Sequence, residues 1–173
     1  MAAAPITQSP ATHCARLAPF RREHAERIAS WVRSPQEAFW LSPRSRPPVT
    51  PASVRSWAGR RREQFVLLRG PGDPIAYGEV NVLNAWQRSF WLGHLIVDGA
   101  CRGQGVGREL TAALLRHAFE QRHAVLVALV VFPENETAVA CYQAAGLRAV
   151  GYETHYFASI GRSARLLRME AAP

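Results

Sequence analysis

The sequence of 173 residues contains no lysine, so all 21 of its basic residues are arginine. This absence excludes several classes of enzyme. A P-loop ATPase and a protein kinase both need a lysine on the phosphates, and Schiff-base and Ser-Lys mechanisms need the amine itself. The formal net charge is +8. Two interpretations of the arginine content stay open: it reflects genome composition, or an anionic partner is held somewhere on the surface.

Long apolar runs, a secretory signal and paired cysteines are also missing. No apolar segment approaches the roughly 18 residues of a membrane helix, and residues 1–10 lack the basic start and apolar stretch of a secretory signal. The three cysteines, Cys14, Cys101 and Cys141, form no Cys-x-x-Cys pair, so we expect neither a disulfide framework nor a metal site. These absences predict a cytoplasmic protein with no membrane partner.

The residues that are present indicate one globular α/β domain over residues 1–173, with residues 1–12 as a flexible leader. Hydrophobic residues make up 48% of the chain and charged residues 20%, as in ordinary folded proteins. Hydrophobic periodicity and turn residues predict the elements. In the first half we expect an edge strand over 14–18, a helix over 22–32, a loop over 34–51, a helix from Thr50 and Pro51, and an antiparallel meander over 65–97.

The second half indicates a β-α-β-α-β segment. Its centre is the continuous apolar run over 125–132, which is typical of a strand covered on both faces. We expect helices over 108–121 and 135–145, and late strands over 147–155 and 165–170.

A glycine-rich turn follows the strand that ends at Val97. It reads Arg102-Gly103-Gln104-Gly105-Val106-Gly107 and leads into a helix. A diphosphate needs consecutive backbone N–H groups directed into one concavity, and side chains at those positions would keep it away. The N-terminus of the following helix favours the same anion. Such turns also cap ordinary helices, so the pattern leaves both interpretations open.

A second motif follows the apolar run over 125–132. Asn135 stands at a helix start, Tyr142 lies two turns further along the same helix, and Gly146 ends it. Asn135 is also a good helix cap, and a tyrosine at that position is also typical of half-buried packing.

Together these two motifs resemble the GNAT superfamily of CoA-dependent N-acyltransferases. The turn R-x-x-G-x-G after one strand and N-x6-Y-x3-G after the next occur in the family's order, and the resemblance covers residues 65–157. The proline-rich segment resembles the branch that contains ribosomal-protein N-terminal acetyltransferases. The chain departs from the family's frequent Asp-Pro at Asp98-Gly99. The resemblance implies a mixed, largely antiparallel sheet whose central strands splay around the CoA arm, with helices on both faces.

The resemblance also implies a binding site for acetyl-CoA as co-substrate. The backbone of Leu95, Ile96 and Val97 would bind pantetheine, and Asn135 would contact the CoA arm. Tyr142 would protonate the leaving thiolate, for which phenol and thiol pKa values are suitably close. The pyrophosphate would bind the N–H groups of Gly103, Gln104, Gly105, Val106, Gly107 and Arg108, with the charges of Arg102 and Arg108 beside it.

Direct attack of an amine on a thioester needs a base and an oxyanion donor. Some family members carry a glutamate on the second central strand, but residues 125–132 contain no acid. Glu79 and His94 are the remaining candidates for the base, singly or as a relay through water. A backbone N–H near Leu95 or Ile96 is the expected oxyanion donor.

We therefore expect an N-acetyltransferase that acts on a small amine or a protein N-terminus in a ternary complex, without a metal. A CoA-binding sensor or scaffold is the alternative. No recognition motif indicates a nucleic-acid partner, and a homodimer stays open. Arg44 and Arg46 lie in the loop that borders the acceptor in this family, and selection of an acidic acceptor is one interpretation of them.

Overall fold

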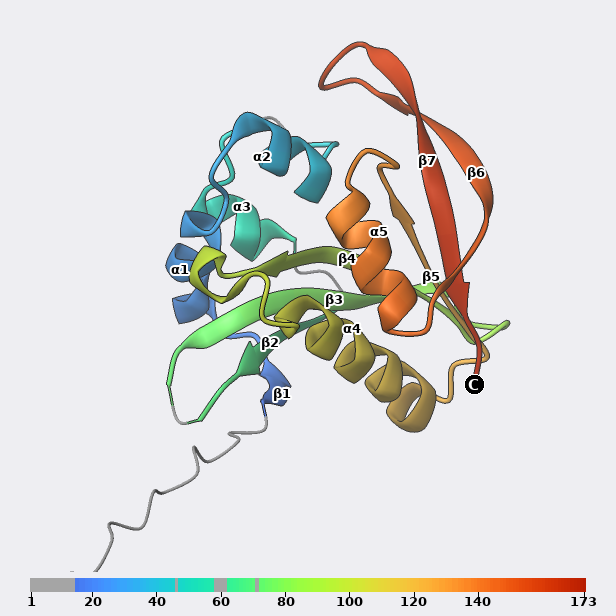
Figure 1. Ribbon diagram of the computed structural model, residues 1–173, viewed down its shortest axis with the longest axis horizontal. Coiled ribbons are helices and arrows are strands. Elements are labelled where there is room, and N and C mark those ends of the chain that lie inside the picture. The colour runs from blue at the N-terminus through green and yellow to red at the C-terminus, as the bar shows by residue number, and fades with distance from the viewer. Residues whose placement is uncertain (1–14, 46, 58–61, 71) are drawn as a thin grey trace, which may run out of the picture.

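The computed structural model of the chain describes residues 15–45, 47–57, 62–70 and 72–173 (Figure 1). The expected leader over residues 1–12, Cys14 and Arg46 lie outside the described residues. The strands span Arg16–Pro19 (β1), Arg62–Leu68 (β2), Pro74–Asn84 (β3), Ser89–Val97 (β4), Leu126–Val131 (β5), Arg148–Phe157 (β6) and Arg162–Ala171 (β7). The helices span Ala25–Ser30 (α1), Pro35–Leu41 (α2), Pro51–Ser56 (α3), Val106–Arg116 (α4) and Glu136–Ala144 (α5), with short helical turns at Arg22–His24 (η1), Gly99–Cys101 (η2) and His117–Gln121 (η3).

The strands form one seven-stranded sheet in the order β1-β2-β3-β4-β5-β7-β6. Every neighbouring pair is antiparallel except β4 and β5, which run parallel. The predicted mixed, largely antiparallel sheet is therefore confirmed, and so is the meander formed by β2, β3 and β4. The predicted edge strand is β1, which pairs with β2 alone.

The loop predicted over residues 34–51 is wrong in its first part, because α2 occupies Pro35–Leu41. Ser34 caps this helix: its hydroxyl oxygen accepts a hydrogen bond from the Glu37 N–H at 3.1 Å. Pro35 is the first helical residue, where a missing N–H costs nothing. The same combination of cap and proline predicts α3 correctly from Thr50. The prolines and arginines further along the segment favoured a loop, and for that reason the helix start at Ser34 and Pro35 was not recognised.

Helices cover both faces of the sheet, as predicted (Figure 1). On one face, Ile28 of α1 and Val54 of α3 pack against Val66 of β2. On the other face, Leu114 of α4 packs in a cluster with Leu67 of β2. Consecutive residues of one strand thus serve opposite layers, as the alternation of a β-strand requires.

The β6–β7 hairpin extends away from the rest of the sheet beside α2 (Figure 1). A third apolar cluster holds it there: Phe132, Phe157 and Leu166 are buried, and Phe39 and Trp40 of α2 pack against them. The hairpin and α2 therefore form a separate wall at one end of the sheet.

The two central strands are paired over only part of their length. Ser89–Trp91 of β4 pairs with Leu126–Ala128 of β5. Beyond these residues β4 continues to Val97 and β5 to Val131, and no pairing between them is present in this described stretch. The predicted splaying of the central strands is therefore confirmed.

A bulge in β4 is the physical reason for this divergence. Tyr77 and Glu79 of β3 are opposite Ile96 and Gly93 of β4, so β4 has one residue more than β3 in this interval. His94 takes up the extra length with a φ of 48°, in the left-handed region. A bulge bends its strand and increases the local twist, which turns the end of β4 away from β5.

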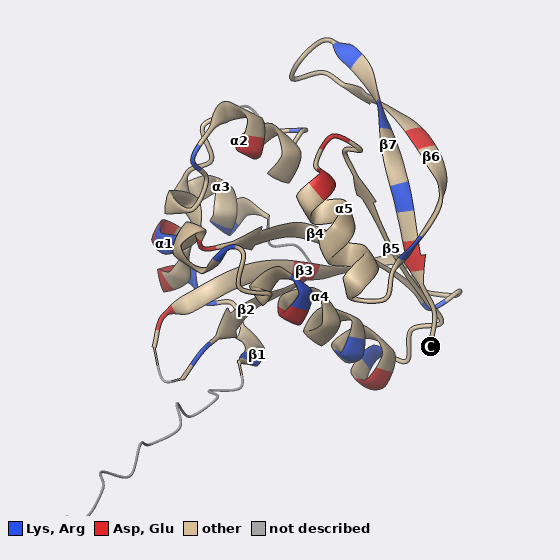
Figure 2. Cartoon of the chain, viewed as in Figure 1, with Lys and Arg blue, Asp and Glu red and all other residues tan. Residues whose placement is uncertain are grey.

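Basic and acidic residues are interspersed along α1, α4 and β7 (Figure 2). Among the described residues, the helices are all too short or too polar to cross a membrane.

Candidate functional site

The glycine-rich turn between β4 and α4 presents a row of backbone N–H groups. Gly103 and Gly105 have φ values of 75° and 80°, and Gly105 is the N-cap of α4. A Cβ on either residue would meet no atom within 4 Å, so the backbone conformation is the reason for glycine at both positions. Within the described part of the chain, the N–H groups of residues 102–108 have no backbone acceptor. The turn is therefore a cup of free donors at a helix N-terminus.

Gly107 serves a different purpose from the other two glycines. A Cβ there would stand 3.0 Å from Sγ of Cys141 on α5 and 3.7 Å from a methyl group of Val97. This glycine therefore lets α4 lie close to both α5 and the end of β4.

Arg102 does not offer the open charge that the sequence predicts beside the turn. Its Nη1 donates to Oε1 of Glu37 at 2.5 Å, and its Nη2 donates to the carbonyl oxygen of Trp31 at 3.0 Å. Its Nε donates to the carbonyl oxygen of Val97 at 3.2 Å. These bonds tie the turn to α2 and the end of α1. Arg108, in the first turn of α4, is exposed.

The remaining side chains of the turn contribute little to the cup. The amide nitrogen of Gln104 donates to the carbonyl oxygen of Ala100 at 3.1 Å, which braces the turn internally. Val106 is buried in the main apolar cluster. Any contact of these two residues with an anion is therefore through their backbone N–H groups.

Asn135 and Tyr142 occupy the predicted positions on α5. The Asn135 side chain caps the helix by accepting from the Ala138 N–H at 3.3 Å. Tyr142 is half-buried against the main apolar cluster. Burial raises the pKa of its hydroxyl, with a smaller contribution from neighbouring Cys141. Tyr142 therefore stays protonated and remains a hydrogen-bond donor at neutral pH.

Leu95, Ile96 and Val97 form the last part of β4, where that strand has separated from β5. Ile96 and Val97 pair on their other side with Tyr77 and Ala76 of β3. The Asp98 N–H donates to the Ile75 carbonyl oxygen at 2.9 Å, so alternation also directs the N–H and carbonyl of Ile96 to β3. The backbone groups of Leu95 and Val97 face the unpaired side and are left for another partner. The Val97 carbonyl is the exception, because it accepts from Arg102.

Glu79 is fully buried and lies at the centre of a polar network. The Tyr77 hydroxyl donates to its Oε1 at 2.7 Å, and the Asn81 amide donates to its Oε2 at 3.3 Å. Nδ1 of His94 is 3.0 Å from Oε1 without the alignment of a hydrogen bond, which leaves Nδ1 buried with no aligned partner among the described residues. The structure thus brings together the two predicted candidates for the base.

The network keeps Glu79 ionised. Burial raises the pKa of its carboxyl, but His94, Tyr77 and Asn81 together lower it by more, so the pKa is below its ordinary value of 4.5. The indole of Trp57 stacks on the His94 ring at 4.2 Å with an interplanar angle of 4°. The His94 side chain is 19% exposed, whereas Glu79 is not exposed at all. Solvent therefore reaches the pair through His94.

Glu79 and Tyr142 approach the central strands from opposite faces of the sheet. Tyr77, which bonds to Glu79, belongs to the cluster under α1 and α3. Tyr142 packs on the cluster under α4. The two groups have access to one common substrate only where β4 and β5 are separated.

A cavity of about 470 Å³ lies between α2, the residues that follow β5 and the start of β7. Phe132, which directly follows β5, forms part of its wall. Sequence reasoning missed most of this cavity, because its wall includes the unpredicted helix α2. The lining residues are Pro35, Gln36, Phe39, Trp40, Phe132, Glu134, Ile160, Arg162 and Ala164. Arg44 is not among these lining residues. Elsewhere in the described part of the chain, no three His, Cys, Asp or Glu side chains lie close enough together to hold a metal ion.

A sequence model of the acetyltransferase (GNAT) family matches residues 21–147. The N-alpha-acetyltransferase RimI of Mycobacterium tuberculosis is 28% identical over 125 residues, which cover 72% of this chain and 77% of that protein. An uncharacterized protein of Mycobacterium leprae, ML0378, is 39% identical over 77 residues, or 44% of this chain. The match spans only 20% of the length of the Mycobacterium leprae protein.

Solved structures with the same fold include spermidine N-acetyltransferases of Vibrio cholerae. One, in complex with CoA and spermine, has a TM-score of 0.77 at 20% identity and covers 92% of this chain and 95% of its own. Another, a dodecamer in an intermediate state, has a TM-score of 0.68 at 20% identity and covers 92% and 94%. At these identities the likeness concerns the fold.

The buried carboxylate predicts a specific dependence of stability on pH. Because its pKa is lower in the folded protein, Glu79 stabilises the fold above pH 4.5 and loses this contribution as the pH falls further. Glu79→Gln should therefore lower the free energy of unfolding by about 1–3 kcal/mol at pH 7, and by less at pH 3. Urea unfolding of both proteins at each pH measures the difference. A difference that stays constant from pH 7 to pH 3 contradicts the assignment.

Proposed function

The chain belongs to the GNAT acetyltransferase family, and we propose that it transfers an acetyl group from acetyl-CoA to a primary amine by direct attack in a ternary complex. The separation of β4 from β5 is the observation that carries this proposal. It leaves a strand edge free beside a cup of backbone donors, which is the arrangement that a long thioester ending in a diphosphate needs.

The residues present fit acetyl-CoA. Gly103 and Gly105 leave open space over the cup, so a diphosphate reaches the N–H groups from Gly103 to Arg108 without displacing a side chain. Leu95 and Val97 supply the unpaired backbone groups of β4 for pantetheine, whereas Ile96 faces β3, and Asn135 is the N-cap of α5. When bound, acetyl-CoA supplies the activated carbonyl. Arg102 holds the turn in place through Glu37 and leaves the charged contact to Arg108.

His94 and Glu79 prepare the amine. A protonated amine has no free electron pair, so it must lose a proton before it attacks. We assign the acceptance of that proton to His94, directly or through water, because His94 is the exposed member of the pair. Glu79, held ionised and buried, stabilises the positive charge that then develops on the imidazole ring. Tyr77 and Asn81 fix the carboxylate by donating to both of its oxygens.

Two further tasks, stabilisation of the oxyanion and protonation of the thiolate, are carried out by groups of β4 and α5. As the new C–N bond forms, negative charge develops on the carbonyl oxygen, and the backbone N–H at Leu95 donates to it, because that of Ile96 faces β3. Collapse of this intermediate breaks the C–S bond and releases the thiolate. Tyr142 then gives its proton to the sulfur; it is protonated before this step because burial raises the pKa of its hydroxyl.

The acceptor class is a primary amine. Two kinds are represented among the relatives, an N-terminal α-amine in the RimI protein and a polyamine in the Vibrio cholerae enzymes.

The free thiols of Cys101 and Cys141 suit a reducing compartment, and we place the reaction in the cytoplasm.

Calorimetry with acetyl-CoA and an assay of thiol release test the proposal. We expect acetyl-CoA to bind, and free CoA thiol to appear only when an acceptor amine is added. A mixture of primary amines serves for the first screen, with tertiary amines of similar size as controls that cannot form a stable amide. If acetyl-CoA does not bind, or if no amine increases thiol release, the proposed function is wrong.

Tyr142→Phe should lower kcat by about 10²-fold or more, because a general acid contributes roughly 10²–10⁴ to the rate. The change removes one hydroxyl from a half-buried ring, so the affinity for acetyl-CoA should stay within about twofold. Steady-state kinetics and calorimetry on the same preparation separate the two effects. Tyr156→Phe is the matched control, since Tyr156 is 67% exposed on β6. Equal kcat values for the two variants would exclude Tyr142 as the acid.

Glu79→Gln should lower kcat by about 10²-fold, because the amide keeps the shape of the carboxylate but no longer stabilises a protonated His94. Glu63→Gln is a close control: the Glu63 carboxylate on β2 also contacts a histidine, with 2.8 Å between its Oε2 and Nε2 of His117. That pair belongs to the outer side of the main apolar cluster, so its loss should leave kcat within about twofold. A similar decrease in both variants would indicate a structural effect rather than a catalytic one.

A further inference from the structure

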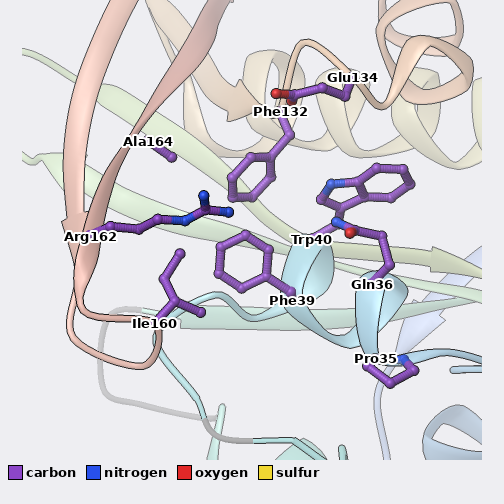
Figure 3. A pocket seen from close by; sticks show the side chains of 9 residues that line it. All are labelled: Pro35, Gln36, Phe39, Trp40, Phe132, Glu134, Ile160, Arg162 and Ala164. Atoms are coloured by element: carbon purple, nitrogen blue, oxygen red, sulfur yellow. The ribbon is translucent and has the colours of Figure 1, made fainter.

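The cavity beside α2 has aromatic walls (Figure 3). The ring centroids of Phe39 and Phe132 are 4.9 Å apart, and Phe157 lies 5.7 Å from Phe39 behind them. The Trp40 indole stands next to these rings at the mouth of the cavity in the same view. Such walls favour a flat apolar group, which gains both burial and ring–ring contact. A volume of about 470 Å³ is at the lower end of the roughly 300–1,000 Å³ of small-molecule sites.

The cavity lies where the acceptor must enter. β4 and β5 separate toward their carboxyl ends, and Phe132 and Glu134 follow the carboxyl end of β5. The opposite wall is α2, which is joined to the glycine turn through the bond between Glu37 and Arg102. A molecule in the cavity therefore lies beside the slot, which is the space between the separated ends of β4 and β5 that we propose for the thioester.

Two charged residues of opposite sign complete the lining. Glu134 comes from the loop after β5 and Arg162 from the start of β7. In Figure 3 the guanidinium of Arg162 points toward the rings of Phe39 and Phe132. Neither charge forms an ion pair with another described residue. A cation and an anion at one aromatic cavity match a ligand that carries both charges.

We infer that the acceptor is an aromatic amino acid with a free carboxylate, a substrate class that rests on the proposed function. The aromatic side chain packs against the rings of Phe39, Phe132 and Trp40 that line the cavity. The carboxylate binds Arg162, whose planar guanidinium suits bidentate pairing with it. Glu134 attracts the ammonium group to the mouth of the slot, where the amine loses its proton and attacks the thioester carbon.

The same lining disfavours a polyamine. Spermidine carries several ammonium groups, and the cavity offers one carboxylate next to a guanidinium. The chain also has a net charge of +8, so a polycation is repelled at long range as well as in the cavity. The shared fold with spermidine N-acetyltransferases therefore does not make a polyamine the acceptor of this chain.

A panel of four acceptors tests the inference in the thiol-release assay. L-Phenylalanine carries the ring, the amine and the carboxylate. Phenethylamine lacks the carboxylate. In an amidated dipeptide that begins with phenylalanine, a peptide bond replaces the carboxylate. Spermidine has no aromatic ring. We expect kcat/KM to be about tenfold or more higher for phenylalanine than for each of the other three.

The variant Arg162→Gln assigns the carboxylate contact. It should raise KM for phenylalanine about tenfold with kcat within twofold, and should leave phenethylamine unchanged within twofold. Because the same two amines are compared in each protein, their different intrinsic reactivities cancel. Arg165→Gln is the matched control on the same strand: the Arg165 guanidinium stacks on the Tyr152 ring at 3.9 Å and does not line the cavity.

The outcomes separate this inference from the proposed function. If acetyl-CoA binds and phenethylamine, the dipeptide or spermidine is acetylated at least as well as phenylalanine, the inference is wrong and the proposed function stands. The inference is also wrong if Arg162→Gln affects phenylalanine and phenethylamine equally, or if acetyl-CoA binds and phenylalanine is not acetylated. If acetyl-CoA does not bind at all, the proposed function itself is wrong.

Discussion

One extra residue in β4 determines where this protein can bind and react. His94 takes a left-handed backbone conformation to accommodate it, and the strand bends away from β5. A continuous ladder would have used the backbone donors and acceptors of both strands. The bulge leaves those of β4 unused in the middle of the sheet, an arrangement with a free-energy cost that functional sites tolerate. The slot, the cup and the cavity beyond it all open from this divergence.

The divergence also explains why catalytic groups from two layers can act on one molecule. A closed sheet would separate the network of Glu79 and His94, under α1 and α3, from Tyr142 on α5. In the mechanism that we propose, the sheet thus keeps proton removal and proton delivery apart, and the substrate links them. The groups are also kept different in character, because Glu79 is held ionised and Tyr142 is held protonated.

Local sequence signals predicted most of the fold and the chemical types at the site. The turn over residues 102–107 and the pair Asn135 and Tyr142 are found from spacing alone, because a phosphate cup and a helix face each depend on neighbouring residues. Glu79 and His94 were expected as candidates for the base, singly or as a relay through water, and their direct contact was not predicted because it depends on the register of β3 against β4. The bulge that sets this register was not predicted, because the residue with the positive φ is His94 and not the neighbouring Gly93.

The acceptor cavity was out of reach for a different reason. Its wall joins α2, the loop after β5 and the start of β7, and no periodicity connects segments so far apart in the chain. Ser34 and Pro35 gave the start of α2, but arginine and proline residues further along favoured a loop. Of the two arginines considered from the sequence, Arg44 does not line the cavity, and the cavity's arginine is instead Arg162.

The bond between Arg102 and Glu37 joins the two halves of the site before any ligand arrives. Arg102 stands at the first position of the glycine turn, and Glu37 lies on the helix that carries Phe39 and Trp40. This bond fixes the distance between the glycine turn and the aromatic cavity in the folded chain, and with it the spacing of the two substrates that we propose for these places. A reaction between two molecules otherwise loses much of its rate to their mutual alignment. Here the ion pair between Arg102 and Glu37 sets that alignment when the chain folds.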